Sequence, residues 1–170
     1  MPKAYVIGEQ RRLLVLQTNG EYFVTIKEIG SPKSVTFPAK RWARLIQLLP
    51  QIENGVNCLH AKQFVDFKLH IGGAYFVSVA SGYNCVDLRE FYFHSVKGAQ
   101  PRKVPGIALR LPEWQKLKEL LPLLNKKFPD LANATPCDHP AYDVMLRCIE
   151  CQPFQDKELS HSLTTQPFVF

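Results

Sequence analysis

Two stretches of the chain share one order of hydrophobic and polar positions. In each stretch, short runs rich in β-branched and aromatic residues come first, and hydrophobic residues spaced by three or four positions follow. The runs cover residues 13–17, 22–26 and 35–37, and then residues 75–79, 85–93 and 107–109. Short runs of this kind predict strands, and the longer spacing predicts an amphipathic helix. Each stretch therefore predicts a small antiparallel sheet followed by a helix.

Turn residues and helix faces support this prediction. Asn19-Gly20 separates the first two runs, and Ser81-Gly82 separates the corresponding runs of the second stretch. Asn-Gly between such runs is a strong hairpin signal. Pro50 and Pro122 are expected to end or kink the two helices. The predicted core-facing residues of these helices are Trp42, Leu45, Leu49 and Ile52, and Trp114, Leu117, Leu121 and Leu124.

The two stretches align with each other as an internal repeat. A shift of 62 positions places residues 12–29 on 74–91, and a shift of 72 places residues 34–50 on 106–122. Five residues of the helical block are then identical, namely one Trp, three Leu and one Pro. The larger shift gives the second copy ten extra residues, which we expect to form a loop around His94 to Pro105.

This repeat predicts an α+β protein built from two tandem β-β-β-β-α units. The first and more divergent unit covers residues 1–55, and the second covers residues 62–128. Residues 129–170 form an acidic tail that contains Cys and His.

Charge is distributed unevenly over these parts. The net charge of +6 consists of +4 over residues 1–55, +6 over residues 56–128 and −4 over residues 129–170. A basic body favours binding to phosphates, and an acidic tail favours contacts with other proteins. With 46% hydrophobic and 21% charged residues, the composition is that of a globular protein.

Several classes of protein are not favoured. No apolar run approaches the roughly 18 residues of a membrane span, and residues 1–12 lack the apolar stretch of a secretory signal. The odd number of cysteines, five, favours reduced thiols and an intracellular protein. Asp87 and Glu90 lie on opposite faces of a regular strand, and no phosphate loop or nucleophile motif is present. We expect no enzymatic activity.

Four blocks of the second copy carry a family resemblance. They are Tyr75-Phe-Val-Ser-Val79, the run from Val86 to Tyr92, Gly106-Ile-Ala-Leu109, and the run from Glu113 to Glu119. In this order they resemble the core domain of the positive cofactor four family of transcriptional coactivators, which bind single-stranded DNA. The resemblance covers about residues 68–124. Residues 6–52 resemble the family only indirectly, because they align with the second copy.

This resemblance implies an arrangement and a set of binding residues. Family members pair two such domains across their helices, so two copies in one chain imply an intrachain pseudo-dimer of curved antiparallel sheets with helices at the interface. By the resemblance, Arg89 holds a phosphate and Tyr92 stacks on a base. Both reach one strand of nucleic acid only if the protein strand bends or bulges between them, since they face opposite sides of a regular strand. The alternative for Tyr92 is packing in the core.

Further residues are implied less directly. Lys97, Arg102 and Lys103 lie where the family has a basic loop, although a solvated loop is an alternative. Tyr83 follows the hairpin Gly82, where the family has a turn phenylalanine. In the first copy Lys27 matches Arg89, while Gly30 stands where Tyr92 would be. The additional cations of the first copy that we expect to follow a nucleic-acid backbone are Arg11, Arg12 and Lys33.

The tail carries a candidate metal site. Cys137, His139, Cys148 and Cys151 are four ligands of the kind that structural zinc prefers. The alternative is that these cysteines are buried as plain hydrophobic residues. The final residues, 166–170, end in Phe. Some viral and bacterial single-strand-binding proteins use an acidic segment with a terminal Phe to recruit partners, and the alternative is that this Phe simply packs.

These observations predict a non-enzymatic protein that binds single-stranded DNA with little sequence preference, in transcription or in replication and repair. No cofactor is required for binding, the location is nuclear, and the tail contacts transcription or replication proteins. The protein is expected to be a monomeric pseudo-dimer or a higher homo-oligomer. The alternatives are an adaptor or transcription coregulator that keeps the fold but binds proteins, and a single-stranded RNA binder.

Overall fold

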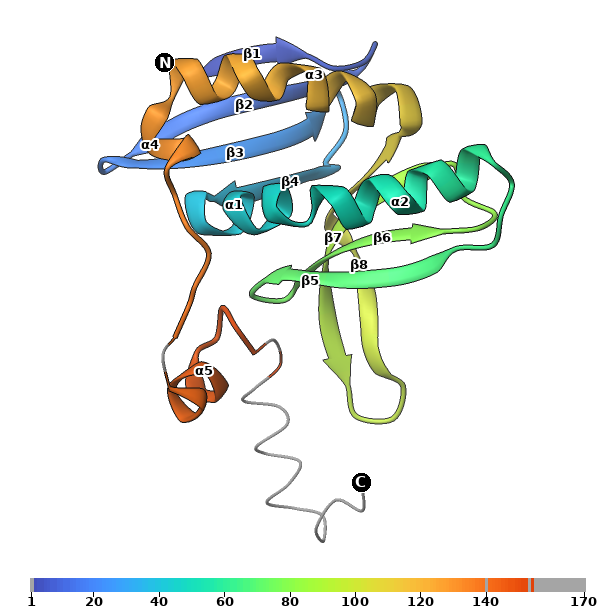
Figure 1. The fold of residues 1–170 in the computed structure, drawn as a ribbon, viewed down its shortest axis with the longest axis vertical. Coiled ribbons are helices and arrows are strands. Elements are labelled where there is room, and N and C mark those ends of the chain that lie inside the picture. Colours follow the sequence, from blue (N-terminus) through green and yellow to red (C-terminus); the bar gives the residue numbers. More distant parts are fainter. Residues whose placement is uncertain (1, 140, 153, 155–170) are drawn as a thin grey trace, which may run out of the picture.

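The chain forms two antiparallel sheets of four strands each, with helices after each sheet (Figure 1). The computed structural model describes residues 2–139, 141–152 and 154. The first unit consists of β1 (Lys3–Val6), β2 (Arg11–Thr18), β3 (Glu21–Glu28), β4 (Ser34–Pro38), α1 (Ala39–Gln47) and α2 (Leu49–His60). The second unit consists of β5 (Asp66–Gly72), β6 (Tyr75–Ala80), β7 (Cys85–His94), β8 (Gly98–Arg110) and α3 (Leu111–Lys127). The short helices α4 (Pro129–Ala132) and α5 (Tyr142–Arg147) follow.

The prediction of a mixed α+β protein with two tandem units is confirmed. The strands run in the sequential orders β1-β2-β3-β4 and β5-β6-β7-β8. Asn19 and Gly20, with φ of 53° and 80°, form the turn between β2 and β3. These positive angles are what a two-residue hairpin turn of type I′ requires.

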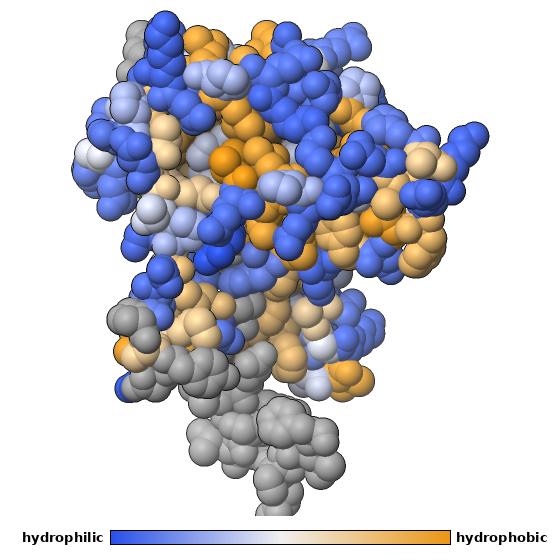
Figure 2. Space-filling view, viewed as in Figure 1, coloured by the Kyte–Doolittle hydropathy of each residue, from blue (hydrophilic) through white to orange (hydrophobic). Residues whose placement is uncertain are grey.

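The hydrophobic core is continuous between the two units. Trp42 and Trp114 each occupy the fourth position of their helix, and they are 2% and 1% exposed. The two tryptophans therefore take equivalent buried places, as the repeat predicts. On the face that carries the helices, hydrophobic side chains form a band between the helices, with hydrophilic side chains around it (Figure 2). No helix in the described part of the chain is long and apolar enough to cross a membrane.

The helices of the first unit contact the second sheet as well as their own. Helix α1 packs on β3 and β4 and also on β5, while α2 packs on β6. Strands β4 and β8 lie close together where the two sheets meet. At the far end of α3, the ring of Phe128 contacts that of Tyr22 on β3 at 5.7 Å between centroids.

The two prolines of the repeat act differently from each other. The helical segment of the first unit is interrupted at Leu48, and Pro50 is then the second residue of α2. A proline is tolerated there because its missing N–H has no partner in the first turn. Helix α3 instead continues through Pro122 to Lys127, so of the two expected effects, Pro122 does not end the helix. Leu124, beyond this proline, is buried and keeps the last turns packed on the core.

The ten extra residues of the second copy are mostly strand, with a short turn at residues 95–97. They lengthen β7 and β8 into a hairpin over residues 91–101, here called the arm, which projects beyond the other strands (Figure 1). The pairing register shifts between Arg89 and Phe91, which pair with Gly106 and Pro101. The residues in between form a bulge at the base of the arm.

Candidate nucleic-acid interface and metal centre

The second sheet has one face turned toward the helices and one face turned away, which we call the open face. Side chains alternate between the two faces along each strand. Val77, Val79 and Leu88 point into the core and are at most 1% exposed. The alternating positions on the open face are Lys68, His70, Phe76, Ser78, Ala80, Cys85, Asp87, Arg89, Phe91 and Ala108.

A groove of about 450 Å³ lies on the open face. Small side chains, among them Ser78, Ala80 and Ala108, form its floor. Tyr83, Arg89 and Phe91 add two aromatic rings and a cation to its lining. A groove with this size and lining can accommodate a planar ring next to a charged group.

Aromatic rings and a cation gather beside this groove. The ring centroids of Phe76 and Phe91 are 5.0 Å apart, and those of His70 and Phe76 are 5.3 Å apart. The Nζ atom of Lys68 lies 5.0 Å from the ring centroid of Phe76 and 4.6 Å from that of Phe91. Aromatic faces next to cations are what single-stranded nucleic acids require of a binding surface.

This cluster of Lys68, His70, Phe76 and Phe91 was not predicted from the sequence. The alternation of residues 66–72 places Lys68 and His70 on one face of β5, which is a signal present in the sequence. Their proximity to Phe91, however, depends on how three strands pair, and a local sequence pattern does not predict that pairing.

Arg89 is engaged within the protein. Its guanidinium donates two hydrogen bonds to the carboxylate of Asp87, at 2.6 and 2.7 Å, and one to the backbone oxygen of Arg102 at 2.7 Å. The Asp87 hydrogen bonds raise the pKa of Arg89, against the effect of its partial burial. Arg89 therefore holds the bulge at the base of the arm, and its expected phosphate contact stays a prediction.

Tyr92 lies on the other side of the arm. Its ring is 37% exposed, and the guanidinium carbon of Arg102 lies 4.9 Å from its centroid. Arg102 also forms an ion pair with Glu90 at 3.2 Å. Arg89 and Phe91 line the groove together, so Tyr92, the residue after Phe91, points away from it. The expected bulge is present, but it leaves Arg89 and Tyr92 on different faces.

The remaining predicted residues of the second copy are exposed. Lys97 lies in the turn at the tip of the arm, and Lys103 lies in the bulge. Tyr83 is 68% exposed after the β6–β7 turn and lines the groove. Their role in binding stays a prediction.

The predicted cations of the first copy fall into two groups. Arg11 is 8% exposed: it donates hydrogen bonds to Glu28 and to the backbone oxygen of Ala108, and so connects the two units. Arg12 donates to the backbone oxygens of Gly8 and Glu9, in the β1–β2 turn, and of Arg11. Lys27 and Lys33 are exposed.

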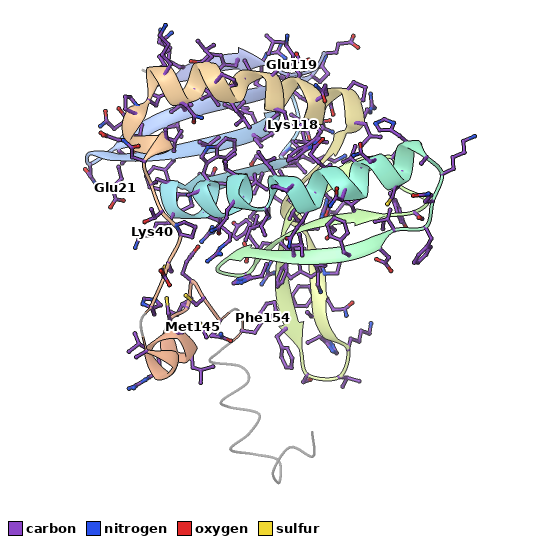
Figure 3. The ribbon with its side chains drawn as sticks, in the orientation of Figure 1. Glu21, Lys40, Lys118, Glu119, Met145 and Phe154 are labelled. Atoms are coloured by element: carbon purple, nitrogen blue, oxygen red, sulfur yellow. The ribbon has the colours of Figure 1, made fainter. Side chains whose placement is uncertain are left out.

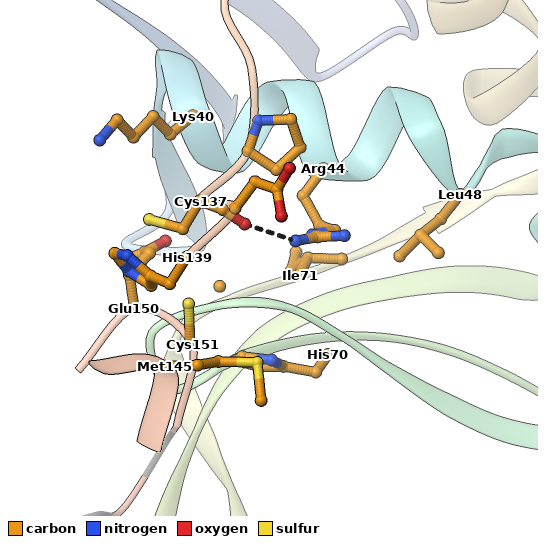
Figure 4. Close-up of a pocket in the computed structure, with 13 residues that line it drawn as sticks. Lys40, Arg44, Leu48, His70, Ile71, Cys137, His139, Met145, Glu150 and Cys151 are labelled. Atoms are coloured by element: carbon orange, nitrogen blue, oxygen red, sulfur yellow. Dashed lines mark hydrogen bonds between the residues drawn. The ribbon is translucent and has the colours of Figure 1, made fainter. Parts of the chain in front are cut away.

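The four expected metal ligands converge. Cys137 and His139 precede α5, and Cys148 and Cys151 follow it. Their ligand atoms all lie within 4.8 Å of one another. Figure 4 shows three of the four residues, Cys137, His139 and Cys151, in the lining of one cavity. The Nε2 atom of His139 is buried without a hydrogen-bond partner. A cluster of one imidazole and three thiols can hold a metal ion.

Comparisons with protein-family models, curated proteins and solved structures found no match. The function proposed below is therefore based on the geometry of the chain itself.

The metal-ligand cluster is attached to the folded body by polar contacts. Glu150 accepts two hydrogen bonds from Arg41, at 2.9 and 3.1 Å, and its backbone oxygen accepts one from the N–H of Gly73 at 2.9 Å. A side chain on Gly72 would collide with the Glu150 carboxylate, so the glycine makes this approach feasible. Arg44 donates to the backbone oxygen of Cys137 at 3.3 Å (Figure 4).

The thiols of the cluster influence one another. Desolvation opposes ionisation of Cys148, but hydrogen bonds from the His139 ring and the backbone lower the pKa of this thiol to about 7. Desolvation and the neighbouring Cys148 raise the pKa of Cys151 to about 11. Desolvation also raises the pKa of Cys137, while nearby Lys40 acts in the opposite direction. The pKa values of these three thiols therefore depend on one another, unlike those of separate surface cysteines.

Proposed function

We propose that the chain binds single-stranded nucleic acid on the open face of its second sheet, with little sequence preference. One observation carries this proposal: the Lys68 ammonium lies over the rings of both Phe76 and Phe91, beside a groove that Arg89 also lines. Rings offer stacking surfaces to any base, and cations follow the phosphates. The net charge of +6 adds a general attraction to the backbone.

The geometry favours a single strand over a duplex. In a duplex the faces of the bases are stacked on each other and are not accessible to a ring on the protein. The groove of about 450 Å³ has room for an unstacked base. The same face accepts DNA or RNA, because no contact to a 2′-hydroxyl is needed for stacking. We further propose a role at unwound strands in transcription or in replication and repair, with a nuclear location.

The two units are proposed to form an intrachain pseudo-dimer. Helices α1 and α2 contact the second sheet, and α3 reaches the first sheet through Phe128 and Tyr22. This exchange of helix contacts supports the arrangement. In it, the second unit stacks on bases, and Lys27 and Lys33 of the first unit add exposed charge.

A fluorescence-anisotropy titration tests the binding proposal. The ligands are a labelled single strand of DNA, the same sequence in RNA and its DNA duplex, each at two salt concentrations. We expect tighter binding to the single strands than to the duplex. Lys68→Ala should weaken binding and reduce the salt slope by about 0.7, the value for one phosphate contact on a single strand.

Lys126→Ala is the matched control, because Lys126 is an exposed lysine in the last turn of α3, on the helix side of the protein. It should leave the slope unchanged. Equal effects of the two variants would contradict binding on the open face. Absence of binding to every oligonucleotide would refute the proposal and favour the protein-interaction adaptor.

We further propose that Cys137, His139, Cys148 and Cys151 hold a structural zinc ion. The donor set fits: three thiolates and one imidazole make a common structural zinc site, and four protein ligands leave no open position for catalysis. The buried and unpartnered Nε2 of His139 supports this assignment. Lys40 and Arg44, both in the lining of the same cavity, offset the negative charge that three thiolates bring.

Elemental analysis and cobalt substitution test the zinc proposal. We expect one zinc per chain, and a tetrahedral thiolate–cobalt absorption spectrum after exchange. Cys148→Ser should lose the metal, whereas Cys58→Ser should keep it, because Cys58 lies on α2 outside the cluster. Protein purified without chelator that contains no metal would refute the assignment.

A further inference from the structure

The aromatic cluster of the open face already contacts a ring from the tail. The ring of Phe154 is stacked on that of Phe76, with centroids 6.3 Å apart and planes inclined by 22°. Its centroid is also 6.2 Å from that of Phe93 on the arm. Figure 3 shows Phe154 close to the base of this arm. Phe76 is only 9% exposed, although it points away from the helices.

The position of Phe154 follows from the contacts just before it in the chain. Cys151 belongs to the metal-ligand cluster, and Glu150 is held by Arg41 and by the N–H of Gly73. Gly73 lies in the turn between β5 and β6, the strands that carry Lys68 and Phe76. Only two residues separate Cys151 from Phe154, so the attached cluster places this ring at the open face.

The site that Phe154 occupies has the chemistry of a base-stacking site. Phe76, Phe91 and Phe93 supply rings, and Lys68 lies over two of them. Phe76 and Phe91 are not part of the main core cluster, so their burial depends on neighbours on the open face. A nucleobase stacked on Phe76 would take the near-parallel orientation that Phe154 takes.

We propose that Phe76, Phe91, Phe93 and Lys68 form a stacking site for one nucleobase, and that Phe154 occupies this site until a base displaces it. This inference rests on the proposed binding of single strands and adds an intramolecular competitor to it. The attached metal-ligand cluster determines how often Phe154 occupies the site.

Phe154→Ala removes the competitor. We expect binding to a labelled single strand of DNA to become roughly two- to tenfold tighter, the equivalent of one aromatic ring pair. The matched control is Phe64→Ala, because Phe64 is 83% exposed in the segment between α2 and β5. The control should bind as the parent does.

The attachment is tested separately. Glu150→Ala removes the contact to Arg41 and should tighten binding in the same direction as Phe154→Ala. Removal of the metal with a chelator should do the same in the parent. Neither change should add to the effect of Phe154→Ala, because the competing ring is then already absent. Additive effects would contradict the proposed link.

The outcomes separate the two proposals. If the parent binds single strands and Phe154→Ala binds with equal or lower affinity, Phe154 is not a competitor and the inference is overturned while the binding proposal stands. If neither protein binds any single strand, the proposed function fails and the inference falls with it. If chelation leaves the affinity of metal-containing protein unchanged, the cluster does not control Phe154.

Discussion

Glu53 on α2 joins the two units through hydrogen bonds to two residues of α3. Its Oε1 atom accepts a hydrogen bond from the indole Nε1 of Trp114 at 2.9 Å, and its Oε2 atom accepts one from Nζ of Lys118 at 2.7 Å. Trp114 is 1% exposed, so its N–H depends on the Glu53 carboxylate as its hydrogen-bond partner in the intact protein. Glu53→Ala therefore tests whether the two repeats stabilise each other.

The expected cost follows from these two contacts. A buried N–H that loses its partner costs about 1–3 kcal/mol. The ion pair to Lys118 adds only about 0–1 kcal/mol, because the side chains of Lys118 and Glu53 are 21% and 31% exposed. We expect Glu53→Ala to lower the free energy of unfolding by roughly 1–4 kcal/mol. For a chain of this size that is a fall in Tm of roughly 2–16 °C.

Chemical and thermal denaturation followed by circular dichroism measure this loss. Glu53→Gln keeps a carbonyl oxygen for Trp114 and should lose only about 0–1 kcal/mol. Lys118→Met removes the ion pair alone and should behave like Glu53→Gln. If Glu53→Ala is as stable as Glu53→Gln, the indole hydrogen bond does not contribute to the contact between the repeats and the reasoning is wrong.

Two further predictions follow from packing and from the faces of the arm. Gly55→Ala should destabilise the fold by about 1 kcal/mol or more, because the new methyl group would collide with the ring of Phe67. The control is Asn54→Ala, at an exposed position of the same helix, which should be neutral or slightly stabilising in the same denaturation experiment. Tyr92→Ala and Phe93→Ala should differ in the anisotropy assay, because successive strand residues face opposite sides of the arm. A loss of about 1–3 kcal/mol confined to Tyr92→Ala would support the stacking residue implied by the family resemblance. A loss confined to Phe93→Ala would support the open face, and equal losses would contradict a single binding side.

The fold could be predicted from the sequence because its signals are local and occur twice. The hairpin at Asn19-Gly20 and the helices that begin before Trp42 and Trp114 each depend on a few neighbouring residues. The repeat then supported each assignment with a second copy. The metal-ligand cluster could also be predicted, since its four ligands lie within fifteen residues of one another.

The candidate binding surface could be predicted only in part. Lys68, Phe76 and Phe91 lie on three different strands, and their proximity depends on strand register. The role of Arg89 in holding the bulge depends on Asp87 and on a carbonyl oxygen thirteen residues away. The burial of Arg11 likewise depends on Ala108 in the other unit. Contacts of this kind have no signature in a periodic pattern.

The difference between the two copies indicates how the work is divided between them. At the positions equivalent to Phe76, Arg89 and Phe91, the first copy has Leu14, Lys27 and Ile29. Leucine and isoleucine cannot stack on bases, and Lys27 has no equivalent of the long arm to support. The first unit instead supplies α1 and α2, which cover the second sheet, and Arg11, which bonds to β8. A chain that needed two equal binding faces would keep aromatic residues at these positions in both sheets. We therefore infer that the first unit mainly stabilises the second, so substitutions at Leu14 or Lys27 should affect nucleic-acid affinity less than substitutions at Phe93 or Lys68.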